Sequence, residues 1–178
     1  FDGTVPAIAV AVAGGLAFLA SMTLSERERR VAAAVSQRLD VEMATAKRIQ
    51  MGILPKAAEV FPDEQRFSIA AISEPARTVG GDLYDFFLLD DKRLFFLVGD
   101  VSGKGPEASL FMAISKALCK SSALRDMESI GAVLEQANSE IARDNPGTMF
   151  VTAFAGILDV ETGALEFCSA GHEQPWRI

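Results

Sequence analysis

Two glycine-rich segments, each carrying a carboxylate, flank a strand-like stretch and constrain the fold more than any other feature. The first is Val79-Gly-Gly-Asp-Leu-Tyr-Asp85 and the second is Gly99-Asp-Val-Ser-Gly-Lys-Gly105. The hydrophobic runs Leu83–Leu89 and Arg93–Val98, joined by the polar turn Asp90-Asp91-Lys92, predict a β-hairpin. Carboxylates on neighbouring strands, beside glycines that let the backbone approach a ligand, are typical of sites for divalent metals and phosphoryl groups.

Two helices and further strands are predicted around this hairpin. Pro106–Ala123 and Met127–Arg143 have helical spacing of their apolar residues, whereas Arg66–Ser73, Met149–Leu158 and Ala164–Ser169 resemble strands. The apolar face of the first helix is expected to comprise Leu110, Ala113, Ile114, Ala117 and Leu118, and that of the second Ile130, Val133, Leu134, Ala137 and Ile141. Hairpins on each side of a helix pair favour an α+β fold with antiparallel sheets.

Composition limits the classes of function. The chain has 178 residues, enough for one domain and an appendage, and 49% of them are hydrophobic. Its net charge of −7 argues against nucleic acid as a partner, because binding to nucleic acid requires a basic surface. Cys119 and Cys168 match no metal-ligand or redox spacing, so we expect reduced core thiols. Met149–Thr152 and Trp176 are also interpreted as core.

The first 24 residues are the most apolar part of the chain. No charged residue occurs from Gly3 to Leu24, and a helix needs about 20 apolar residues to cross a bilayer. Arg27, Arg29 and Arg30 follow directly, as the positive-inside rule expects of a cytoplasmic flank. These features predict a transmembrane helix over residues 1–24, with a buried helix of a soluble domain as the alternative.

Residues 25–56 predict a helical linker. Leu39, Met43, Ala46, Ile49 and Ile53 recur every three or four residues and form one apolar stripe. The stripe can pair with its copy in a homodimer or pack on the domain that follows. Pro55 ends the helix.

Asp82 and Asp100 are the strongest candidates for metal ligands. Asp100 ends a hydrophobic strand, where an acidic side chain is costly unless it is paired or bound to a metal. Gly103 and Gly105 precede a helix that Pro106 begins, so backbone N–H groups there are expected to face an anion. A Walker A loop is excluded, because only three residues separate Gly99 from Gly103.

These motifs together resemble the SpoIIE/RsbU-type bacterial members of the metal-dependent (PPM, type 2C) serine/threonine protein phosphatases. The resemblance covers the chain from about Ala44 to its end. It is carried, in order, by Ala46-Lys-Arg-Ile-Gln50, Ile53-Leu-Pro55, Pro75-Ala76, the two glycine-rich segments, Ala108, Leu110, Met112, Met149-Phe-Val-Thr152 and Ala170-Gly-His172.

The resemblance implies an αββα sandwich of two antiparallel sheets flanked by helices, with two Mn²⁺ or Mg²⁺ ions at one end. It makes residues 57–178 the N-terminal part of a phosphatase domain. Asp82, Asp100 and the Val101 carbonyl would hold metal. Separately from the resemblance, Gly103 and Lys104 are expected near the substrate phosphate, with a solvated loop lysine as the alternative for Lys104, and His172 is expected to have a structural or substrate-proximal role. The family's further metal-binding carboxylate belongs to a later Asp-Gly motif that this chain, ending at Ile178, does not contain.

The implied function is dephosphorylation of phosphoserine or phosphothreonine on a signalling protein, with a phosphorylated anti-sigma-factor antagonist as the expected partner. The expected location is the cell inner membrane, with the phosphatase domain in the cytoplasm. Two alternatives remain. One is an inactive phosphatase-like module that binds a partner protein, and the other is a two-metal hydrolase of small phosphate esters.

Overall fold

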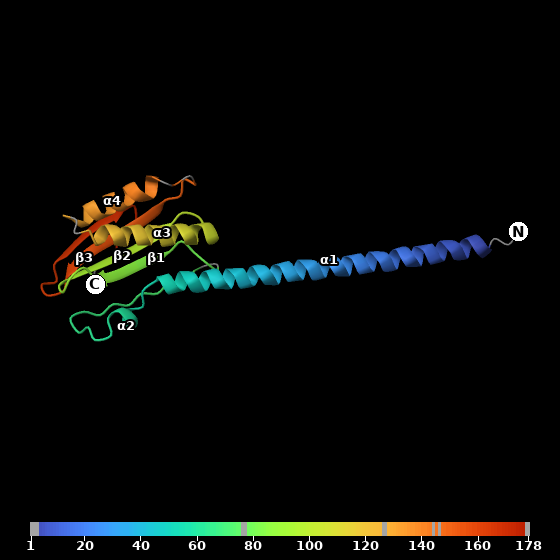
Figure 1. Cartoon of the computed structure of the whole chain (residues 1–178), viewed down its shortest axis with the longest axis horizontal. Helices are drawn as coiled ribbons and strands as arrows, with labels where there is room; N and C mark the ends of the chain where they lie inside the picture. The colour runs from blue at the N-terminus through green and yellow to red at the C-terminus, as the bar shows by residue number, and fades with distance from the viewer. Residues whose placement is uncertain (1–3, 76–77, 126–127, 144, 146, 177–178) are drawn as a thin grey trace. The chain divides into compact units, whose positions relative to one another are not determined.

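The computed structural model describes residues 4–75, 78–125, 128–143, 145 and 147–176 (Figure 1). The chain divides into two compact units, residues 1–44 and residues 45–178. Helix α1 (Thr4–Ile53) supplies all the secondary structure of the first unit and continues into the second. It ends where predicted, because Pro55 disfavours helical backbone at Leu54.

The described side chains of α1 bear on the prediction of a transmembrane helix over residues 1–24. Residues 21–42 are all exposed and carry charges from Glu26 onward. Among the residues with described side chains, no helix has an apolar stretch long enough to cross a bilayer. The prediction of a transmembrane helix over residues 1–24 therefore finds no support. Residues 1–3, and most side chains of the remainder of that segment, lie outside the described part.

The second unit is built on one antiparallel sheet with the strand order β1-β2-β3-β4. The strands are β1 (Leu83–Leu88), β2 (Arg93–Val101), β3 (Val151–Asp159) and β4 (Leu165–Ala170). Both predicted hairpins are confirmed, β1–β2 and β3–β4, and the helix pair leads from β2 to the adjacent strand β3.

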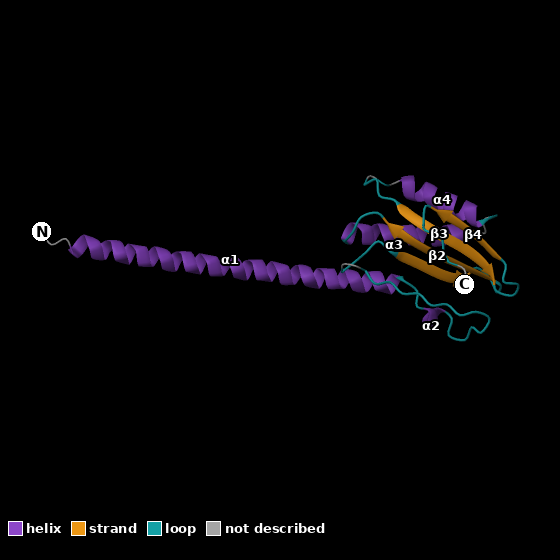
Figure 2. Ribbon diagram, turned by 180° about the vertical axis from the view of Figure 1, so that it is seen from behind, coloured by secondary structure: helices purple, strands orange, loops and turns teal. Residues whose placement is uncertain are grey.

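Helices α3 (Pro106–Ala123) and α4 (Ile130–Arg143) lie side by side on one face of the sheet (Figure 2). Helix α3 packs over β1 and β2, and α4 packs over β3 and β4. The core between helices and sheet includes Leu83, Phe95, Leu97, Met112, Ile130, Val133 and Ala155. Because alternate strand residues point to opposite faces, this layer fixes which residues of β1 and β2 face away from the helices.

The face predicted for α4 is confirmed, but the face predicted for α3 is wrong. Leu110 and Ile114 of α3 are 66% and 46% exposed. The buried residues of α3 are Ala108, Met112, Ser115, Lys116, Cys119, Ser122 and Ala123. This stripe has the same helical spacing as the predicted one, and it turns Lys116 toward Asp85 in β1, with an Nζ–Oδ2 distance of 2.9 Å.

The sandwich of two sheets is reduced, in the part that the structure describes, to one sheet with two helices. Arg66–Ser73, predicted as a strand, forms no ladder. Its Phe67 instead packs edge-on against Phe61, with ring centroids 5.2 Å apart, and Phe61 in turn lies against Phe86 of β1. The segment Arg66–Ser73 thus packs on Phe61 through the ring of Phe67 and not through strand pairing. Helix α2 (Ala57–Val60), which immediately precedes Phe61, is a single turn.

Candidate metal centre

Asp82 and Asp100 lie next to each other across the β1–β2 ladder. The register pairs Leu83 with Gly99, so Asp82, one residue before β1, is directly opposite Asp100 near the end of β2. Both side chains lie on the face of the sheet away from α3 and α4, since Leu83 and Val101 are in the core on the other face. The sequence prediction that the two glycine-rich segments bring these carboxylates together agrees with this geometry.

Gly81 makes this close approach possible. A Cβ built on Gly81 would lie 2.6 Å from the Val101 carbonyl oxygen and 3.1 Å from Oδ1 of Asp100. The Val101 N–H donates a hydrogen bond to the Gly81 carbonyl over 3.3 Å. Any side chain at position 81 would therefore push apart the backbone segments that carry the two carboxylates and the Val101 carbonyl.

A hollow of about 170 Å³ collects most of the predicted site residues. It is lined by Pro75, Val79, Gly80, Gly81, Asp82, Asp100, Gly103 and Lys104. Gly103 and Gly105 have positive φ angles of 94° and 82°, which glycine adopts without strain and which turn the chain from β2 into α3. The structure thus brings Asp82, Asp100, Gly103 and Lys104 to one cavity.

The environment of Asp82 disfavours its ionised form. Partial burial raises the pKa of Asp82 above its ordinary value, and the charge of Asp100 and a hydrogen bond with it raise that pKa further, while His172 partly opposes the shift. Two neighbouring carboxylates that resist joint ionisation are stabilised by a cation placed between them.

Oxygen ligands of this kind fit Mg²⁺ or Mn²⁺, and the ligand set present is partial. Hard divalent cations bind carboxylate and carbonyl oxygens, which Asp82, Asp100 and Val101 offer here. Within the described ranges, no three His, Cys, Asp or Glu side chains converge on one point. Two carboxylates and the neighbouring Val101 carbonyl are therefore candidates for part of a metal site.

His172 is linked to this site through a residue that the sequence analysis assigned to the core. The Thr152 hydroxyl lies 2.9 Å from Nδ1 of His172 and 3.3 Å from the carbonyl oxygen of Asp100. Thr152 pairs with Asp100 across the β2–β3 ladder. His172 does not line the 170 Å³ hollow. The signal that identifies Thr152 is the β2–β3 register, which places it beside Asp100.

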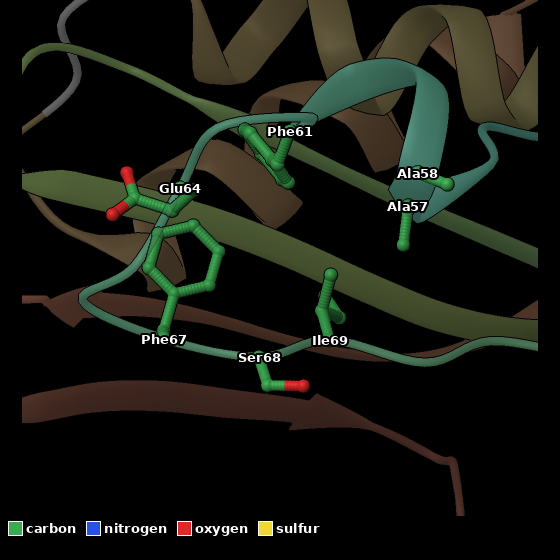
Figure 3. A pocket seen from close by; sticks show the side chains of 7 residues that line it. All are labelled: Ala57, Ala58, Phe61, Glu64, Phe67, Ser68 and Ile69. Atoms are coloured by element: carbon green, nitrogen blue, oxygen red, sulfur yellow. The ribbon is translucent and has the colours of Figure 1, made fainter.

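Two other features of the chain are poorer sites. Burial raises the pKa of Cys119 to about 11, so its thiol is neutral near pH 7 and a weak nucleophile, as expected of a core cysteine. A second hollow of about 240 Å³ beside α2 contains Glu64 and Phe67 among its lining residues (Figure 3). Glu64 is the only charged residue lining it and is already paired with Arg66. Neither feature presents converging catalytic groups.

Comparison with known proteins decides the family. A model of the stage II sporulation protein E (SpoIIE) family matches residues 90–178, which is half of the chain. The chain belongs to the SpoIIE family. The predicted resemblance is thereby confirmed, and of the two candidate metal ligands Asp100 lies in the matched region and Asp82 precedes it.

Individual relatives agree with this assignment. Protein IcfG of Synechocystis is 32% identical over 160 residues, which is 75% of this chain and 25% of the relative. Phosphoserine phosphatase RsbU of Bacillus subtilis is 27% identical over 154 residues, covering 84% of this chain and 43% of the relative. The chain thus spans less than half the length of either protein.

A solved structure supports the fold. The SiaA-PP2C domain of Pseudomonas aeruginosa superposes with a TM-score of 0.64 at 20% identity, over 77% of this chain and 55% of that domain. The similarity shows that the antiparallel sheet and its helices have the arrangement of a PP2C domain.

Proposed function

We propose that this chain carries the N-terminal part of a metal-dependent phosphatase that removes phosphate from phosphoserine or phosphothreonine on a regulatory protein. The observation that carries the proposal is the pairing of Asp82 and Asp100 in a hollow that also contains Lys104. Membership of the SpoIIE family supports the reaction class. A phosphorylated anti-sigma-factor antagonist is the proposed substrate.

Each residue of the site has a distinct role in this proposal. Asp82, Asp100 and the Val101 carbonyl hold the metal, which supplies Lewis acidity and neutralises charge on the phosphoryl group. Lys104, which lies in the turn before α3 and lines the hollow, attracts the phosphate with the positive charge on its flexible side chain. Gly103 has no side chain, so the phosphate oxygens can approach its backbone. His172 acts through Thr152, which holds both its ring and the backbone of Asp100.

The test is phosphate release from a phosphoserine-bearing antagonist protein, with and without Mn²⁺. Asp82→Asn and Asp100→Asn are expected to lower the Mn²⁺-dependent rate more than about 100-fold, since even residues that only orient a metal ligand commonly contribute about 10–100-fold. Asp63→Asn makes the same chemical change in an exposed loop and should leave the rate unchanged. Chelation should abolish the release, and added Mn²⁺ should restore it.

The alternatives predict different outcomes. A folded protein that binds the phosphorylated partner without releasing phosphate, at any Mn²⁺ concentration, would be a binding module. The partial ligand set is the observation in favour of that alternative. Release from small phosphate esters but not from the phosphoprotein would indicate a metabolite hydrolase. The second sheet of the sandwich, the pairing of α1 in a homodimer and the cellular location stay predictions from the sequence.

A further inference from the structure

Gln50, in the last turn of α1, hydrogen-bonds both backbone groups of Gly80, two residues before Asp82. Its Nε2 donates to the carbonyl oxygen of Gly80 over 2.6 Å, and its Oε1 accepts from the Gly80 N–H over 3.2 Å. Gln50 is only 3% exposed, although it is polar and lies on a helix whose preceding residues are mostly exposed. A buried side chain that satisfies both groups of one residue thirty positions later is a specific tether.

The tethered residue leads directly into the candidate ligands. Gly80 is followed by Gly81, which lies against the Val101 carbonyl and the Asp100 carboxylate, and then by Asp82. Val79, on the other side of Gly80, is 2% exposed. The Gln50 amide thus anchors the backbone two residues before Asp82.

We propose that Gln50 is a positioning residue for the metal centre: its amide fixes Gly80 so that Asp82 stays opposite Asp100. This inference rests on the proposed function, because it assigns Gln50 to the same site. Gly80 lies outside any strand, so no ladder partner replaces the two hydrogen bonds if Gln50 is removed. Gly80 is partly buried, so its backbone groups favour local rearrangement when they lose both partners, and here that rearrangement moves a ligand.

The chemistry requires an amide at position 50. A carboxylate can accept from the Gly80 N–H but cannot donate to its carbonyl, and it would add negative charge beside two aspartates. An aliphatic side chain of similar size fills the space but makes neither bond. Gln50→Leu and Gln50→Glu therefore separate the packing of the side chain from its two hydrogen bonds.

The experiment measures Mn²⁺ binding directly, by the loss of the free Mn²⁺ signal in electron paramagnetic resonance, and the exchange rate of the Gly80 amide by NMR. Gln50→Leu and Gln50→Glu are expected to weaken Mn²⁺ binding about 10-fold to 100-fold, as loss of a group that orients a metal ligand does. They should also speed exchange at Gly80. Gln37→Leu makes the same change at an exposed position of α1 and should alter neither quantity.

The outcomes distinguish the two proposals. Unaltered Mn²⁺ affinity and unaltered Gly80 exchange in folded Gln50 variants would overturn the inference while leaving the phosphatase proposal intact. A wild-type protein that binds no Mn²⁺ would overturn the phosphatase proposal, and the positioning role with it. If Gln50→Leu does not fold, Gln50→Glu decides the matter, since it keeps the size of the side chain and one of its bonds. At saturating Mn²⁺ the Gln50 variants are expected to release phosphate at the wild-type rate, because the metal ligands themselves are unchanged.

Discussion

At the scale of single residues, the buried pair of Asp85 and Lys116 joins β1 of the sheet to α3. The Asp85 and Lys116 side chains are 2% and 9% exposed, and Nζ lies 2.9 Å from Oδ2. The other carboxylate oxygen accepts from the Phe86 N–H over 3.0 Å. Asp85 of β1 is three residues after Asp82, but it faces the helices, so it serves packing and not the hollow.

Breaking this pair is expected to be costly, because it leaves one charge buried without its partner. Lys116→Met should lower the free energy of unfolding by about 3–5 kcal/mol, measured by urea denaturation. The double change Lys116→Met with Asp85→Leu should lower it by less than Lys116→Met alone. Lys92→Met, which breaks the exposed pair with Glu161, should lower it by less than about 1 kcal/mol. Equal losses for Lys116→Met and Lys92→Met would contradict this account.

At the scale of elements, the sequence predicts helix and strand boundaries better than it predicts which face of a helix is buried. Pro106 at the first turn identifies the start of α3 correctly. Its buried face, however, contains polar Ser115 and Lys116, so hydropathy favoured the wrong stripe. The burial of Lys116 depends on its ion pair with Asp85 of β1, which is a tertiary contact and gives no signal in the local sequence.

The same reason explains which parts of the site could be predicted. Asp82 and Asp100 follow from local signals, since each is beside glycine at the end of a strand. Gln50 and Thr152 carry no such signal, because their partners lie far away in the sequence. Trp176, interpreted as core, is 95% exposed, since composition alone does not say what covers an aromatic side chain.

The corrected face of α3 leads to a direct prediction. Met112 is completely buried, so Met112→Ala should lower the free energy of unfolding by about 2–5 kcal/mol through lost contacts and a cavity. Leu110 is 66% exposed, and Leu110→Ala should change it by less than about 0.5 kcal/mol. Thermal or urea unfolding of the two variants measures the difference. The reverse order would restore the face expected from hydropathy.

At the scale of the whole molecule, the stabilising core belongs to one of the two units. The core residues run from Leu83 to Cys168, all within residues 45–178. Exposed side chains at residues 21–42 stabilise a helix little, because helices in water depend on packing of an apolar face. Gln50 and Leu54, which is 4% exposed, belong to the unit that has the core.

Two truncations test this division and the importance of the end of α1. A chain that begins at Thr45 keeps Gln50 and Leu54, so its urea unfolding midpoint should match that of the full chain. A chain that begins at Met51 keeps Leu54 but loses Gln50, which leaves the Gly80 N–H and carbonyl without their partners. Its free energy of unfolding should be lower by about 1–3 kcal/mol, because two hydrogen bonds of about 0.5–1.5 kcal/mol each are lost. Equal stability of the two truncated chains would mean that water replaces the Gln50 amide at no cost, whereas a large loss on starting at Thr45 would mean that the first unit contributes to the stability of the second.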